Sequence, residues 1–318
     1  MQPASFAGGS AKQPAKAEGR RHADNPFAAQ RIDGTQAVLA LLNQYDGASA
    51  ALAFQRLAWL KPLYETLAAD VAAEPLAVCV TDAKSGELAA VLPLVVTREG
   101  RLSVVSWASL GVSDYGAPVL GPKAPVDPRA CHALWTATKR ALTGFDVLHL
   151  SNMPETIEGR VNPFAHLTSR RRSRHSRNAV TLSGSVEEFL ASRGKKYRKE
   201  AERCTRLIAE KGTPEFARAE NLEDITAAYA TLAKQQRDRH QASGSDYRLD
   251  EAAYARFFEV ALREGTPQHS AHIFTLRAGG ETGAVLYGIS NGSTFTLLRI
   301  STAGEAGVST KDAAAVSR

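Results

Sequence analysis

Hydrophobic residues recur with a helical period at the start of the folded chain and then change to the pattern of strands. Apolar residues three and four positions apart over 52–69 predict an amphipathic helix, in which Pro62 marks a kink or a break. The apolar segment 37–42 before it is compatible with a strand or with a short helix. Three apolar runs follow, separated by glycine-containing turns, and each predicts a strand of an antiparallel group: 76–80, 88–96 and 102–110.

One more helix and one more strand complete this first region. Asp127 followed by Pro128 is typical of a helix N-cap and first helical position, and predicts a helix that ends near Leu142. Residues 147–150 predict a further strand. The region is therefore a mixed α/β pattern of helix, three strands, helix and strand.

The same order of elements begins again in the second half of the chain. The predicted elements are a strand at 214–218, a helix from Asn221 or Asp224 to about His240, a helix from Asp250 to Arg263, and strands at 272–277, 283–289 and 295–300. We therefore predict an α/β fold of two tandem domains with similar mixed sheets. The second domain is incomplete, and we expect it to expose apolar surface beside its last strand.

Polar segments flank and separate the two domains. The predicted organisation is a disordered tail (1–30), a first domain (31–165), a basic linker and helix (166–212), a partial second domain (213–302) and a second disordered tail (303–318). Inside the linker, Ser185 and Glu188 have the spacing of a capping box, which predicts a helix to about Lys211 that Gly194 divides in two.

Positive charge is concentrated in this linker. Residues 168–206 contain twelve Lys and Arg and four Asp and Glu, a net charge of +8, whereas the whole chain carries +6. Such a segment either attracts an anionic partner or is simply a solvated linker and helix face. Tyr197 is the only aromatic residue among the charges of its helix, which weighs against base stacking and hence against a nucleic-acid partner.

Cysteine usage and hydropathy limit the class of protein. Cys79, Cys131 and Cys204 lie far apart, which suits neither a disulfide framework nor a metal site, and the histidines lack metal-ligand spacing. We therefore expect a reducing compartment, the cytoplasm, and no metal. No apolar run reaches about 18 residues and the N-terminal segment has no apolar centre, so neither a membrane span nor a secretory signal is expected.

Two polar groups are candidates for chemistry. Ser113, Asp114 and Tyr115 stand side by side in a loop between apolar runs, where they either form a site or cap a tight turn. In the second group, Gln236 and His240 lie one turn apart if the segment is helical. The alternative for this second group is a solvated helix end.

Several short segments, in their order and spacing, resemble the cellulose-biosynthesis (CelD-like) acyltransferases, which have two tandem domains of the GNAT N-acetyltransferase type. That family is distantly similar to the Fem-type peptidyl transferases. The segments that carry the resemblance over residues 30 to 300 are Phe54-Gln55 with Trp59-Leu60, 90–94, 113–115, Tyr197-Arg198-Lys199, and Gln236-Arg237 followed by Gly244.

The resemblance implies transfer of an acyl group from acetyl-CoA or another acyl-CoA to an amine or hydroxyl, with a small-molecule or saccharide acceptor such as an exopolysaccharide precursor. Such transfer needs a base and an acid. The residues expected to take part are Asp114 and His240 as bases, Tyr115 as acid, Ser113, Tyr197, Arg198, Gln236 and Arg237 in substrate binding, and Gly304 and Gly307 in a degenerate phosphate loop. The alternatives are a non-catalytic assembly or regulatory protein of polysaccharide synthesis, or a nucleic-acid-binding module.

Overall fold

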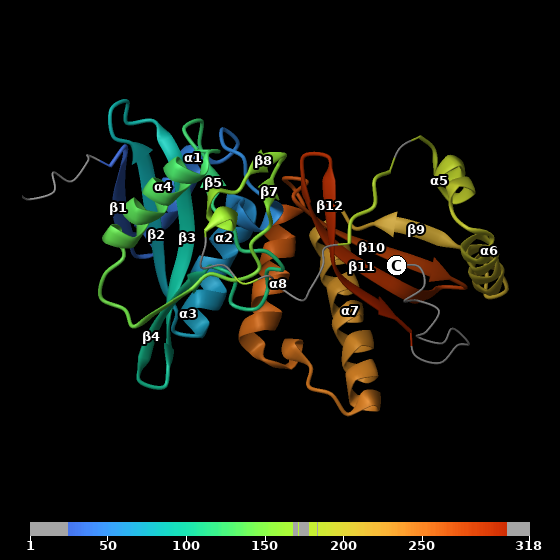
Figure 1. Cartoon of the computed structure of the whole chain (residues 1–318). Coiled ribbons are helices and arrows are strands. Elements are labelled where there is room, and N and C mark those ends of the chain that lie inside the picture. Colours follow the sequence, from blue (N-terminus) through green and yellow to red (C-terminus); the bar gives the residue numbers. More distant parts are fainter. Residues whose placement is uncertain (1–24, 168–170, 172–177, 183, 304–318) are drawn as a thin grey trace, which may run out of the picture.

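The structure, a computed structural model, describes residues 25–167, 171, 178–182 and 184–303. Two mixed α/β domains lie side by side, each built around its own sheet (Figure 1). The main elements of the first domain are β1 (Phe27–Asp33), α1 (Thr35–Tyr45), α2 (Leu57–Pro62), α3 (Ala68–Asp70), β2 (Glu74–Asp82), β3 (Leu88–Glu99), β4 (Leu102–Trp107), β5 (Val119–Leu120), α4 (Pro128–Ala141) and β6 (Val147–His149).

The first sheet has the strand order β1-β2-β3-β4-β6, with β5 paired to β3 beside this path. Its pairs are antiparallel except β4 with β6, which is parallel. Alternate residues of a strand point to opposite faces. Leu76 and Val78 therefore pack with Leu134 of α4 on one face, and Ala77 packs with Leu60 of α2 on the other. This sheet is covered on both faces.

The second domain follows two helices of the linker. These helices are α5 (Val186–Ser192), which has the predicted Ser185–Glu188 capping box, and α6 (Lys195–Ala209). The elements of the second domain are β9 (Glu215–Arg218), α7 (Leu222–Ser243), the 3₁₀ turn η4 (Arg248–Asp250), α8 (Ala252–Gly265), β10 (Ala271–Ala278), β11 (Glu281–Asn291) and β12 (Thr294–Thr302). Its sheet has the order β12-β11-β10-β9 and is antiparallel throughout.

Both domains begin with the order strand, helix, helix, strand, strand, strand, and in both the four strands are neighbours in chain order. The prediction of two tandem α/β domains is confirmed, but of the two described sheets the first alone is mixed, because the second has antiparallel pairs throughout. In the first domain α4 and β6 follow this unit, whereas in the second domain the described residues end one residue after β12. The predicted tail from residue 304 onward lies outside the described residues, as do residues 1–24 of the N-terminal tail.

Three of the predicted elements differ from the structure, and the structure also decides a fourth segment that the sequence left open. Strand β1 begins at Phe27, so the predicted N-terminal tail extended too far. The ambiguous segment 37–42 is helical, as part of α1. The predicted helix over 52–69 begins only at Leu57 and passes into a π-helical segment directly after Pro62, where the proline lacks a donor for the helical ladder. The strand predicted over 102–110 ends at Trp107.

One hydrophobic core extends from the first domain into the second. The ring of Trp59 lies 4.9 Å from that of Phe257 and 6.1 Å from that of Phe258, in edge-on arrangements. Around this core, Lys61 forms an ion pair of 2.7 Å with Glu264. Because these contacts join α2 to α8, the two domains pack together as a unit.

The outer face of the second sheet carries exposed aromatic residues. Phe216 is stacked on Phe274 with ring centres 5.3 Å apart, and Phe216 and Phe295 are 68% and 45% exposed. Leu297 and Ile300 of β12 are also exposed. The expectation that apolar surface is exposed beside the last strand is therefore confirmed. Among the described residues, no helix combines the length and apolar character needed to cross a bilayer.

Candidate functional site

The loop after β4 is held in place by the aromatic core. Trp59 Nε1 donates a hydrogen bond of 2.9 Å to Ser113 Oγ, and Gln55 Nε2 donates one of 3.0 Å to the carbonyl oxygen of Tyr115. The ring of Tyr115 lies 6.0 Å from that of Phe54. The Ser113 hydroxyl thus anchors the loop, which leaves the residue between these two anchors, Asp114, to project from it.

Asp114 is exposed, and its carboxylate has no hydrogen-bond or ion-pair partner among the residues that the structure describes. Neighbouring protein atoms nevertheless displace part of the water around it, and this desolvation raises the pKa of the Asp114 carboxyl above its ordinary value. A carboxylate with a raised pKa and no competing partner is suited to accept a proton.

This loop meets the second domain at Gly111. Its backbone is left-handed (φ +77°), and a Cβ atom there would lie 3.2 Å from Nη1 of Arg248. Glycine therefore allows both the turn and the close approach of the arginine. Beside the α2–α8 contact, the junction between the two domains thus includes the approach of Gly111 to Arg248 of η4.

Gln236 of α7 connects the elements on the second-domain side of this junction. Its Oε1 accepts hydrogen bonds from the Tyr247 hydroxyl (3.0 Å) and from Arg299 Nη1 (3.2 Å), and its Nε2 donates one of 2.9 Å to the carbonyl of Ile300. Burial raises the pKa of Tyr247 to about 12, so its hydroxyl stays protonated and donates. Gln236 is fully satisfied by the protein and acts as a spacer that fixes Tyr247 and Arg299.

His240 and Arg237 are the other residues that the sequence placed here. The His240 ring is stacked on Tyr247 with centres 4.9 Å apart, and its Nδ1 lies 2.9 Å from Ser245 Oγ. Arg237 Nε forms an ion pair of 2.7 Å with Asp250. This pairing occupies the arginine that the sequence assigned to substrate binding.

The structure connects the two predicted groups through a residue that neither contains. Arg248 approaches the loop of Asp114. Its positive charge also lies near enough to Arg299 to lower the pKa of that arginine. Across the described residues, no hydrogen bond or ion pair joins Asp114 directly to His240. Arg248 and Arg299 had no recognisable motif, since single arginines between apolar residues are common, and only their contacts mark them.

Tyr197 and Arg198 are placed elsewhere. They lie on α6, at the end of the second sheet that faces away from the first domain (Figure 1). The structure therefore does not bring them to the junction. The side chains of α6 are all at least partly exposed. Gly304 and Gly307, predicted to bind phosphate, lie outside the described residues.

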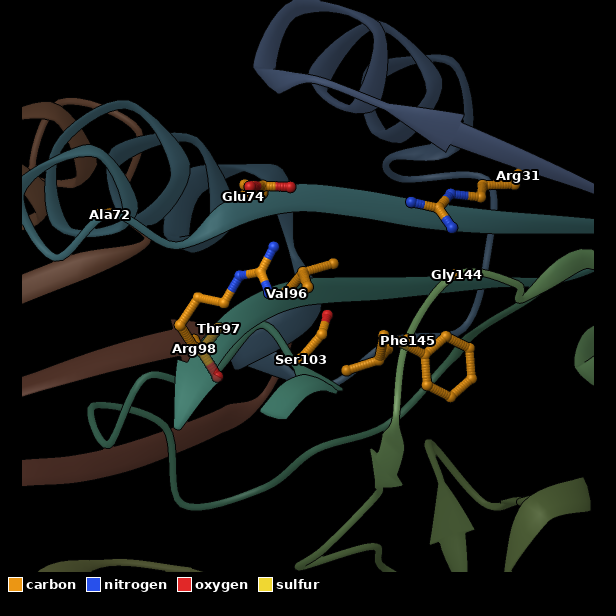
Figure 2. Close-up of a pocket in the computed structure, with 10 residues that line it drawn as sticks. Arg31, Ala72, Glu74, Val96, Thr97, Arg98, Ser103, Gly144 and Phe145 are labelled. Atoms are coloured by element: carbon orange, nitrogen blue, oxygen red, sulfur yellow. The ribbon is translucent and has the colours of Figure 1, made fainter. Parts of the chain in front are cut away.

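A separate pocket lies at the opposite end of β4 from the loop. The guanidinium groups of Arg31 and Arg98 and the carboxylate of Glu74 surround it, together with Ser103 and Phe145 (Figure 2). Its volume is about 90 Å³. Pockets for small molecules usually enclose about 300–1,000 Å³, so this one is large enough only for water or a small ion.

No cluster of three or more potential metal ligands occurs among the described residues. Cys79 and Cys131 carry free thiols. Cys131 is buried, and burial raises the pKa of both its thiol and that of Cys79. A raised thiol pKa disfavours the nucleophilic thiolate. The polar groups of the junction are therefore better candidates for chemistry than the cysteines.

Comparison with known proteins gives one family match and one similar fold. Residues 195–308 match the family described as "Acetyltransferase (GNAT) domain". This match lies in the second half of the chain and includes α6 and the second domain. Its fold is also similar to that in the crystal structure of FemX, with a TM-score of 0.53 and 11% identity over 87% of this chain and 81% of that one. At this identity the likeness concerns the fold alone. A search of curated proteins gives no match.

Proposed function

We propose that this protein transfers an acyl group from an acyl-CoA, such as acetyl-CoA, to an amine or hydroxyl at the junction between its domains. The observation that carries the proposal is the unpaired, partly desolvated carboxylate of Asp114, held beside the GNAT-matching domain. The aromatic core orders the loop on either side of it. Order of this kind keeps a catalytic group in one geometry without further cost during the reaction.

The roles follow from the chemistry of the step. Asp114 accepts the proton of the attacking amine or hydroxyl, whose lone pair then forms the new bond to the thioester carbonyl carbon. The C–S bond breaks, and a nearby acid protonates the leaving thiolate. Tyr115 is the candidate acid, and His240, stacked on Tyr247, is a second candidate base. Gln236 shapes the site from the side of α7.

The resemblance to the CelD-like acyltransferases favours a sugar or an exopolysaccharide precursor as the acceptor, and the cytoplasm as the compartment. A non-catalytic protein that keeps the fold is the main alternative. Acetyl-CoA separates the two possibilities, because a ligand that binds the native state raises the melting temperature. A chain that neither binds acetyl-CoA nor releases free thiol with any amine or sugar acceptor would contradict the proposal.

The decisive variant is Asp114→Asn, measured by release of free thiol from acetyl-CoA. We expect turnover to fall about a hundredfold or more, as for loss of a general base. The acid limb of the pH profile should disappear as well, since that limb reports protonation of the base. Asp238→Asn is the matched control, because Asp238 is exposed and its ion pair among the described residues is with Lys234. Equal losses in both variants would refute a specific role for Asp114.

A further inference from the structure

Two arginines at the junction carry positive charge without an acidic partner. Arg248 and Arg299 form no ion pair with any described carboxylate. Within the described part of the chain, the buried Nε of Arg299 also lacks a hydrogen-bond partner, and its Nη1 donates to Gln236. Buried charge normally requires a partner, since removal from water is costly. Arg299 has no acidic partner among the described residues, and we take this to indicate that an external anion supplies the partner.

The guanidinium groups of Arg248 and Arg299 pack on aromatic rings that lie on one face of α8. The guanidinium carbon of Arg248 is 4.5 Å from the ring centre of Tyr254, and that of Arg299 is 4.2 Å from the ring centre of Phe258. Tyr254 and Phe258 are one turn apart on α8, so their side chains share a face at a spacing of about 6 Å. The aromatic faces stabilise both cations through cation–π contacts.

The pair is unfavourable in isolation. Burial lowers the pKa of Arg299, and the charge of Arg248 lowers it further, against three tyrosines that raise it. Arginine remains charged in proteins, so the two cations repel one another rather than one losing its proton. A singly charged carboxylate would neutralise only one of them. A doubly charged oxyanion has the charge and the number of acceptor oxygens to engage both.

We propose that Arg248 and Arg299 bind a doubly charged oxyanion, such as a phosphate group, on the acceptor. This proposal rests on the proposed function, because it assigns the anion to the molecule that receives the acyl group. The contact of Arg248 with Gly111 places the bound anion beside the loop of Asp114. Gln236 holds the Arg299 guanidinium in position through Oε1. The acceptor is therefore an anionic molecule whose reacting amine or hydroxyl lies within reach of its phosphate.

Inorganic phosphate is the probe, titrated against chloride at constant ionic strength while the melting temperature is recorded. Phosphate should raise the melting temperature of the full chain, whereas acetate, a monoanion, should raise it less. In Arg299→Gln the phosphate affinity should fall ten- to hundredfold, as for loss of a charge-assisted contact. Arg248→Gln, at an exposed position, should show a similar loss of phosphate affinity.

The variants also separate binding from a structural role. Without phosphate, Arg299→Gln should melt at the same or a higher temperature, because one of two repelling cations is gone. A structural arginine would give a lower melting temperature, which would overturn the proposal. Arg98→Gln is the matched control, since Arg98 is another arginine without an ionic partner among the described residues and borders the small pocket (Figure 2). The proposal would also be overturned if phosphate no longer raised the melting temperature of Arg98→Gln. The same holds if phosphate still raised the melting temperature of the Arg248/Arg299 double variant.

Two further measurements assign the anion to the acceptor and keep this proposal distinct from the proposed function. Free coenzyme A also carries phosphates, and its binding should be unchanged in Arg299→Gln; a loss would assign the site to the donor instead. Asp114→Asn should retain phosphate binding while losing turnover. Phosphate binding in a protein without acyltransferase activity would contradict the proposed function and leave the oxyanion site in place.

Discussion

Replacing Phe257 by alanine should weaken both domains at once, because this residue of the second domain belongs to a core shared with the first. Its side chain is fully buried, and its ring packs edge-on against Trp59 at 4.9 Å. Truncation of a buried phenylalanine costs about 3–5 kcal/mol. If unfolding has a urea slope of about 3 kcal/mol per M, the urea midpoint should fall by roughly 1–1.7 M.

Tryptophan fluorescence makes this prediction testable by domain. All three tryptophans, Trp59, Trp107 and Trp135, lie in the first domain, whereas far-ultraviolet circular dichroism reports the helices of both. In Phe257→Ala the midpoints from both signals should shift together. Trp107 and Trp135 pack in a different cluster from Phe257, so their signal does not depend on direct contact with the altered residue.

The matched control is Phe216→Ala, the same change at a 68% exposed position of the second domain. It should change the free energy of unfolding, followed by fluorescence, by less than about 1 kcal/mol, as is usual for surface changes. The shared-core argument would be refuted by an unchanged fluorescence midpoint in Phe257→Ala, with a separate early step seen only by circular dichroism. That result would mean that the second domain unfolds alone.

Two further predictions concern the loop after β4. Gly116→Ala should destabilise the protein by about 1–3 kcal/mol, because the added Cβ would lie 2.0 Å from Trp107 Cδ1. Gly194→Ala, where the Cβ meets nothing within 4 Å, should leave the melting temperature nearly unchanged. Because the folded-state pKa of Asp114 is raised, its contribution to stability is present below the ordinary value near 3.9 and is lost as pH rises through the raised value. Asp114→Asn should therefore melt higher than wild type at pH 7 and equally at about pH 3.5; a lower melting temperature at pH 7 would contradict this.

Elements with strong local signals were predictable from the sequence. Asp127 caps α4 by accepting hydrogen bonds from the backbone N–H groups of Arg129 and Ala130, and Ser185 and Glu188 form the capping box of α5. Such contacts span three or four residues, so the sequence alone determines them. The two-domain α/β pattern followed in the same way from the change between helical and strand periods.

Weak or mixed local patterns account for the elements that the sequence predicted wrongly or left open. β1 is an edge strand of mainly polar and small residues in which only Phe27 is buried, so it lacks a clear alternation. The continuous apolar run 37–42 fits a strand as well as a helix, and packing of Val38 and Leu42 into the core decided for α1. The proline at 62 predicted a kink or a break, and the structure has a π-helical segment directly after it, whose residues are buried in the shared core.

By itself the sequence determined the fold class, the repeated order of elements, the helix caps and the two polar groups at 113–115 and 236–240. Only the tertiary structure decided which of these groups meet. Arg299 reaches Gln236 across 63 residues, and Arg248 reaches Gly111 across a still longer separation. The first contact depends on how β12 packs against α7 within the second domain, and the second on how η4 packs against the loop of the first domain. No local period or spacing encodes that packing. The same packing placed Tyr197 and Arg198 at the opposite end of the second sheet and left two arginines at the domain junction without an acidic partner among the described residues.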